Sequence, residues 1–283
     1  MEKEPVIYQW HFDPSVLLLS MVIVYFYYRI STVRPRKKMI CFWSAISIFI
    51  GVECSPLHDL GMHYYFSAHM ITHVILLLIC GPLLVLSIPS RISSPSIKAI
   101  QRLSVVFAKH NWLAWLSGVG IMWFWHIPVV FDASFSAMDS SFSLINLLQM
   151  SSMLIAGICF SWPLVGPIKS ERIHPLLGIV YLFTACISCS LLGLLITFAP
   201  INVFHHYNKM GASMDMHAIN PWGISPEVDQ QAAGLIMWVP CCFVYLGACI
   251  YLLQQWFREV DRPVNHKLVN LNVTTIDHGG RKS

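Results

Sequence analysis

Charge is the scarcest property of this sequence. Only 11% of its 283 residues are Asp, Glu, Lys or Arg, whereas a soluble domain carries about 25%. Hydrophobic residues make up 56% of the chain, and its mean hydropathy is +0.61. This balance excludes an ordinary soluble protein and predicts an integral membrane protein.

The sequence also lacks the motifs of common hydrolases and nucleotide-driven enzymes. It has no phosphate-binding glycine loop and no pattern typical of a nucleophilic triad. The stretch HMITH, residues 69–73, has the two-histidine spacing of a zinc protease helix. Met70 stands where such a helix carries the glutamate that acts as general base, and a thioether cannot take that role. We therefore expect a protein that is not an enzyme.

No disulfide framework and no cleavable signal peptide are expected. The nine cysteines are an odd number and lie mostly within apolar runs, where cysteine behaves as a small apolar residue. Cys186 and Cys189 form a CxxC pair, but they lie deep within such a run, away from a solvent-accessible helix start. The first 14 residues are acidic, whereas a signal peptide begins with basic residues, so the first apolar run should remain as a helix.

Seven apolar runs are candidates to cross a bilayer as helices, which takes about 20 residues. They are longer and more uniformly apolar than barrel strands, which alternate over about 10 residues, and helices are the remaining way to satisfy the backbone in lipid. The runs cover residues 14–30, 39–56, 62–88, 111–131, 142–165, 175–199 and 231–257. The sequence thus predicts an all-α integral membrane protein, a bundle of seven transmembrane helices that forms a single domain over residues 1–257.

The basic residues predict how this bundle is oriented. Sixteen of the 18 Lys and Arg residues lie beside the inner ends of the runs, and the other side keeps only Lys3 and Lys209. The positive-inside rule then places the N-terminus outside and the C-terminus in the cytoplasm. The net charge of +4 reflects this topology and indicates no nucleic-acid partner. Residues 258–283 become a cytoplasmic polar tail, whose lack of periodicity is typical of a loose segment, and the longest outer loop covers about 200–230.

Histidines gather on the opposite side from the basic residues. Nine of the 13 lie outside or in the outer part of a run. On a helix over residues 62–88, His63, His69, Met70 and His73 share an arc of roughly 120°. His126 lies near the outer end of the fourth run, at the same depth. Three ring systems can therefore meet in the outer leaflet, although a single intramembrane histidine can equally cap or hydrogen-bond a neighbouring helix.

Methionines and two polar residues extend this candidate site. Met150 and Met153 enter at the outer end of the fifth run, although buried methionine also fills ordinary cores. Imidazole suits copper, zinc and iron, and thioether favours Cu(I), so we expect a copper site of His69, His73, His126, His63 and Met150. Asp229 and Gln230, just before the seventh run, could orient one of its histidines.

The outer loop offers a second group of the same donors. Residues 205–217, HHYNKMGASMDMH, hold three histidines and three methionines. Such a composition suits copper capture, although the spacing fits no fixed coordination set.

An ordered set of motifs resembles the CtaG-type cytochrome c oxidase assembly proteins, a family of multi-span membrane proteins. The motifs are WHFDP at 10–14, SPLHD at 55–59, SAHMITH at 67–73, GPLL at 81–84, WHIP at 125–128 and DQQAAGLIMW at 229–238. The resemblance implies a role in maturing a heme–copper oxidase through copper supply, in the cytoplasmic membrane of a bacterium. It also implies His69, His73 and His126 as functional residues, with Asp229 and Gln230 alongside.

The resemblance further implies the partners, which are a cytochrome c oxidase subunit, the lipid bilayer and a periplasmic copper chaperone. One departure concerns the fifth run, where the family is expected to carry a histidine. This sequence has Asn146, Gln149 and Met150 there instead, which makes the site three-histidine with a thioether or changes its metal preference.

Two other functions remain open at this stage. A heme-binding electron carrier would also use intramembrane histidines, but cytochromes b often place axial histidines about 13–14 residues apart on one helix, a spacing absent here. A copper transporter would need donors that continue inward from the histidines. Cys80, Cys186 and Cys189 are the hints of such a row.

Overall fold

The fold is described by a computed structural model that covers residues 10, 12–30, 35–89, 94–136, 144–207 and 222–277, with the backbone alone for 30, 94–96, 136 and 261–277. Within these residues the regular structure is entirely helical, with no strand. The elements are α1 (Pro14–Ile30), α2 (Arg36–Glu53), α3 (Pro56–His63), α4 (Phe66–Ile75), the π-helix η2 (Leu76–Cys80), α5 (Gly81–Ser87), α6 (Ser94–Lys109), α7 (Asn111–Trp125), α8 (Pro128–Ser136), α9 (Leu144–Val165), η3 (Lys169–Glu171), α10 (Pro175–Phe198), η4 (Ile201–Val203) and α13 (Pro226–Asp277).

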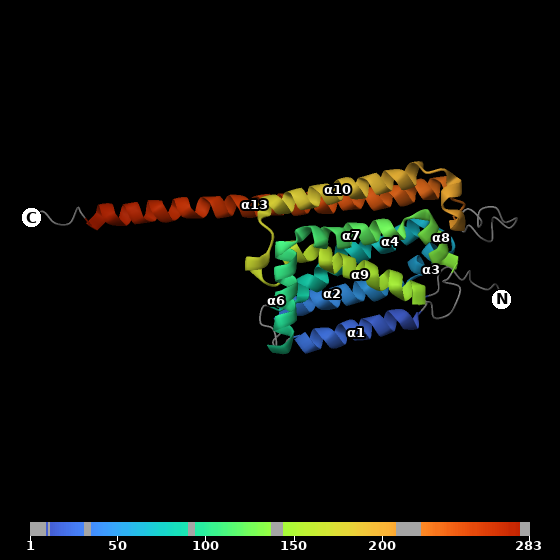
Figure 1. Cartoon of the computed structure of the whole chain (residues 1–283), viewed down its shortest axis with the longest axis horizontal. Coiled ribbons are helices and arrows are strands. Elements are labelled where there is room, and N and C mark those ends of the chain that lie inside the picture. The colour runs from blue at the N-terminus through green and yellow to red at the C-terminus, as the bar shows by residue number, and fades with distance from the viewer. Residues whose placement is uncertain are drawn as a thin grey trace, which may run out of the picture.

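The long helices lie side by side along one direction, as Figure 1 shows. The short helices α3 and α8 lie at one end of this bundle, and α6 lies across the other end. We call these the outer end and the inner end, after the sides predicted from the basic residues. Helix α13 starts at the outer end, passes along α10, and continues well beyond the inner end (Figure 1).

In the part of the chain that the structure describes, four helices are long and apolar enough to cross a membrane, and the number rises to six if each of two bent pairs is one span. The four are Phe66–Ser87, Leu144–Val165, Pro175–Phe198 and Pro226–Val260, and the pairs are Arg36–Glu53 with Pro56–His63 and Asn111–Trp125 with Pro128–Phe135. The all-helical, multi-pass architecture is thus confirmed. The seventh span is not, because α1 has 17 residues and reaches about 26 Å, short of the roughly 30 Å of hydrocarbon. The orientation stays a prediction.

Proline sets both bends. Pro56 occupies the first turn of α3, where its missing N–H costs nothing, and Ser55 caps this helix by accepting a hydrogen bond from the Leu57 amide at 3.3 Å. The bend between α2 and α3 is 47°. A new helix, α8, begins at Pro128 after a 67° bend. His126 lies in that bend, at the end of α7. The WHIP motif therefore fixes where this histidine leaves its helix.

Helix α9 packs directly against the backbone of the π-helix. A Cβ atom on Gly157 would lie 2.6 Å from the carbonyl oxygen of Leu77, and one on Gly81 would lie 2.5 Å from the Gly157 carbonyl carbon. These two glycines allow the helices to approach more closely than any side chain would permit. Met153, one turn before Gly157, is thereby brought against the outer half of Phe66–Ser87.

Two segments differ from the expectations. Residues 94–109 form the helix α6, which was not expected. Its buried residues Ile100, Ser104 and Phe107 form a narrow stripe on one face, so this segment is not a uniformly apolar run. The side chain of Ser104 accepts a hydrogen bond from Trp162 at 3.0 Å. Helix α13 continues to Asp277, whereas the lack of periodicity had indicated a loose segment near the C-terminus.

Replacing Gly157 with alanine should separate α9 from the π-helix. The added methyl group would overlap the Leu77 carbonyl, and overpacking of this kind costs about 1–3 kcal/mol. Unfolding of the detergent-solubilised protein should show this loss. Gly51→Ala is the matched control, because nothing lies within 4 Å of its added Cβ. Equal stability of the two variants would contradict the close packing.

Candidate metal centre

Three of the predicted histidines meet at the outer end of the bundle. The ring centroids of His69 and His73 are 4.2 Å apart, and those of His73 and His126 are 5.4 Å apart. All three side chains are buried, with exposed fractions of 5%, 6% and 3%. The four-residue spacing places the first two on one face of α4, and the bend before Pro128 turns His126 toward them. We call these three residues the histidine centre.

The ring of His126 is held in one orientation. Its Nδ1 lies 2.6 Å from the carbonyl oxygen of Met122, which can only accept, so Nδ1 carries the proton. Nε2 then bears a lone pair and lies 3.2 Å from the sulfur of Met70. A histidine that donates one ring N–H to a carbonyl and presents the other nitrogen is arranged as metal-ligating histidines are.

The other two rings have unsatisfied nitrogens. Nε2 of His69 and Nδ1 of His73 are buried and have no hydrogen-bond partner among the residues that the structure describes. A buried polar atom without a partner costs about 1–3 kcal/mol and is rare in folded proteins. A bound cation would give both nitrogens a partner, which is the observation in favour of a metal.

The donors lie together without forming a finished coordination shell. Within the residues that the structure describes, no three His, Cys, Asp or Glu side chains are arranged to hold a metal ion. Methionine sulfur can also bind a metal, and Met70 places its thioether beside His126. Imidazole and thioether together suit copper, and above all Cu(I). The residues present therefore fit copper by the chemistry of their donor atoms.

His63 lies apart from this group. Helix α3 ends at His63, and α4 starts afresh at Phe66, so the continuous helix over 62–88 that placed His63 on the shared arc does not exist. Its side chain is exposed, with Nδ1 3.2 Å from the carbonyl oxygen of Asp59. The structure thus brings together His69, His73 and His126 and leaves His63 outside.

The two methionines at the start of α9 have different surroundings. Met150 is buried in an apolar cluster with Phe42, Phe49 and Trp125. Met153 lines a small cavity that also touches His73 and Met70. The thioether that joins the histidines is therefore Met153 or Met70 by position, and the ligand role predicted for Met150 has no supporting contact here.

Asp229 supports the centre through the backbone. Its carboxylate accepts hydrogen bonds from the amides of Phe66 at 2.6 Å and Ser67 at 3.2 Å, and from the Ser67 hydroxyl. These are the first residues of α4, where a negative charge satisfies unpaired N–H groups and favours the helix dipole. Asp229 thus orients the helix that carries His69 and makes no direct contact with an imidazole.

Gln230 joins the start of α13 to the end of α10. Its amide nitrogen donates to the carbonyl oxygens of Ile196 at 3.0 Å and Ala199 at 2.7 Å. Together the DQ pair joins the start of α13 to α4 on one side and to α10 on the other. The expected contact that would orient a histidine directly is not among these hydrogen bonds, and a supporting role for the pair stays a prediction.

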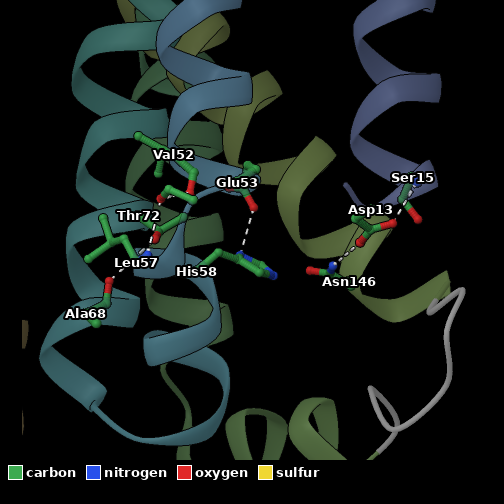
Figure 2. A network of polar contacts seen from close by, with 10 residues as sticks. Asp13, Ser15, Val52, Glu53, Leu57, His58, Ala68, Thr72 and Asn146 are labelled. Carbon is green, nitrogen blue, oxygen red and sulfur yellow. Dashed lines mark hydrogen bonds and ion pairs between the residues drawn. The ribbon is translucent and has the colours of Figure 1, made fainter. Parts of the chain in front are cut away.

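A second polar network lies at the outer end of α1, α2, α3 and α9. Nδ1 of His58 is 3.1 Å from the buried carboxylate of Glu53, and the Asn146 amide donates to Asp13 at 3.2 Å. Figure 2 shows the His58 ring between Glu53 and Asn146. Asn146, which stands where a family histidine was expected, holds α9 to the start of α1. Nearby on α9, the buried amide nitrogen of Gln149 has no hydrogen-bond partner.

The described part of the outer loop covers the centre. Nδ1 of His205 lies 3.0 Å from Asp132 on α8, and the ring of His206 stacks on Phe135 with centroids 4.1 Å apart. Tyr207 donates a hydrogen bond to the carbonyl oxygen of Gly61, and burial raises the pKa of its hydroxyl well above the usual range. The remainder of the predicted copper-capture segment, from residue 208 to 217, lies outside the described residues.

The chain belongs to the family of cytochrome c oxidase caa3 assembly factors, because the model of that family (Caa3_CtaG) matches residues 19–259. The resemblance expected from the motifs is thereby confirmed, and a cytochrome c oxidase is the partner that the family implies. A search of curated proteins and a search of solved structures each found no match.

Asp229→Ala should destabilise the protein by removing the cap of α4. Hydrogen bonds to a charged group contribute about 1.5–3 kcal/mol, and thermal unfolding in detergent should reveal a loss of that order. Glu227→Ala is the matched control, because Glu227 is exposed in the same first turn of α13. If both variants unfold at the wild-type temperature, Asp229 does not hold α4.

Proposed function

We propose that this assembly factor binds copper in the histidine centre and supplies it to the oxidase while the oxidase is being assembled. The observation that carries the proposal is the pair of buried, unpartnered ring nitrogens on His69 and His73. They lie beside a third ring, that of His126, whose free nitrogen is already oriented. The role requires binding and release, and no catalytic step.

The surroundings of the centre favour copper over harder ions. Phe131 and Phe135 pack on the His69 ring, with centroids 5.7 Å and 5.1 Å away. Hard cations such as Mg²⁺ and Ca²⁺ need oxygen ligands, whereas imidazole nitrogen and thioether sulfur suit copper. The histidines would bind it as neutral rings, which keep a lone pair free for the ion.

An apolar groove supports delivery to a partner. It has a volume of about 610 Å³ and lies between the outer parts of α7 and α10, with Trp123 and Leu192 among its lining residues. One end of the groove reaches His126. A helix of an oxidase subunit could approach the centre along it, and the ion would come from the outer side, from a periplasmic copper chaperone.

A heme-binding electron carrier is the weaker candidate. Axial ligands of a heme iron approach from opposite faces of the porphyrin. The rings of His69 and His73 instead contact each other on one face of α4, so no macrocycle fits between them. A copper transporter would use the same centre, and a null strain that loses copper uptake would favour it over an assembly factor.

The copper content of the purified protein tests the proposal. Wild-type protein in detergent should hold copper with nitrogen neighbours, as read by X-ray absorption, and His69→Ala/His73→Ala should lose the nitrogen-bound copper, because two of the three rings are gone. His110→Ala/His174→Ala is the matched control, since both of these histidines are exposed at the inner helix starts. Copper that keeps its nitrogen neighbours in the first double variant, or a well-folded wild type without copper, would contradict the proposal.

A further inference from the structure

A small closed cavity adjoins the histidine centre within the bundle. Its volume is about 10 Å³, close to the space of one water-sized sphere. Six of its eight lining residues carry a sulfur or nitrogen donor, namely Met70, His73, Met122, Met153, Met237 and Cys241. We call this cavity the sulfur chamber. It shares Met70 and His73 with the surroundings of the histidine centre and adds the donors of Met122, Met153, Met237 and Cys241.

The sulfur atoms come from separate helices. Met122 lies on α7, Met153 on α9, and Met237 and Cys241 lie one turn apart on α13. Each of the four is almost fully buried. Methionine often fills irregular core gaps, but here four thioethers and a thiol from four helices surround one void. Leucine would fill the same volume without supplying a donor.

The chemistry of the lining points to one class of ligand. None of the eight lining residues is a carboxylate, hydroxyl or amide residue. A buried water needs two to four polar partners, and a hard cation needs oxygen ligands. The lining side chains supply no oxygen, so the cavity suits neither. Thioether, thiolate and imidazole are the donors that favour Cu(I).

The backbone places these donors together. The chamber lies against the π-helix η2, which supplies Leu77 to its lining, and π-helical turns are frequent at functional sites. The contact of Gly157 with the Leu77 carbonyl sets how closely α9 approaches the π-helix, and this approach fixes the position of Met153. A further sulfur atom lies beside the chamber. The Sγ of Cys189 on α10 is 3.9 Å from the Sδ of Met122.

We propose that the sulfur chamber is a Cu(I) site, held by the thioethers of Met122, Met153 and Met237 and the thiolate of Cys241, with His73 as the link to the histidine centre. Cu(I) replaces the proton of the Cys241 thiol, so the buried site keeps its net charge and the released proton leaves to solvent. The inference rests on the proposed function for the source of the ion. It adds that the ion is stored as Cu(I), on sulfur.

X-ray absorption of the Cu(I)-loaded protein in detergent, under reducing conditions, tests the site. The wild type should give copper with sulfur and nitrogen neighbours. Cys241→Ala should lose the thiolate contribution, and Met122→Leu/Met153→Leu/Met237→Leu should lose most of the thioether contribution while keeping core volume. Met62→Leu is the control, because Met62 is half-buried on α3 and does not line the chamber.

A further variant, His69→Ala/His126→Ala, separates the two proposals. Wild-type copper bound by nitrogen alone would overturn the chamber and leave the proposed function standing. Copper that stays on sulfur and loses nitrogen neighbours in this variant would support both sites, whereas copper that keeps its wild-type nitrogen neighbours would overturn the histidine centre and leave the chamber standing. A stably folded wild type that takes up no Cu(I) would overturn both.

Discussion

The carboxylate of Asp229 accepts hydrogen bonds from the first amides of α4, 163 residues earlier in the chain, and the histidine centre depends on this contact. Without it the unpaired N–H groups at the start of α4 would be buried against α13 with no acceptor. His69 and His73 follow within the next two turns, so any shift of this helix end moves both rings. Gln230 ties the same point to the end of α10. One dipeptide thus fixes the three helices that meet there.

The donor atoms change in kind along α4 and its neighbours. Imidazole nitrogen predominates around His69 and His126, next to the outer loop, and sulfur predominates around Met122, Met237 and Cys241. Nitrogen ligands accept copper in either oxidation state, whereas thioethers favour Cu(I). Under the proposed function, this order would give the assembly factor a place to receive the ion and a place to keep it reduced. The groove that His126 helps to line would make the nitrogen end the one that an oxidase approaches.

The sequence alone predicted the helical membrane architecture and placed three histidines at one depth, but it did not show that their helices are neighbours. The spacing of HMITH is a local rule, whereas the end of α7 at Trp125 was missed, because the apolar run continues to residue 131. The break between His63 and Phe66 was missed, because the two residues between them are tyrosines and neither proline nor glycine marks the end of the helix. Helix α6 was missed because its apolar stripe is narrow.

The sulfur chamber was beyond the reach of sequence patterns. Met237 and Cys241 join Met122 and Met153 only because α13 packs against α4 and α7 packs against α9, and no spacing along the chain encodes these neighbours. The partner of Asp229 was missed for the same reason. Its position just before an apolar run indicated a supporting role, but the residues that it holds lie more than 160 residues earlier in the chain.

The central claim is that copper reaches the oxidase through the histidine centre. The most direct measurement is the copper content of cytochrome c oxidase purified from null cells that carry either wild-type protein or His69→Ala/His73→Ala. The account predicts that the oxidase from the double-variant cells lacks copper, although the variant protein is present in the membrane at the wild-type level. An oxidase with its full copper content in those cells would contradict it.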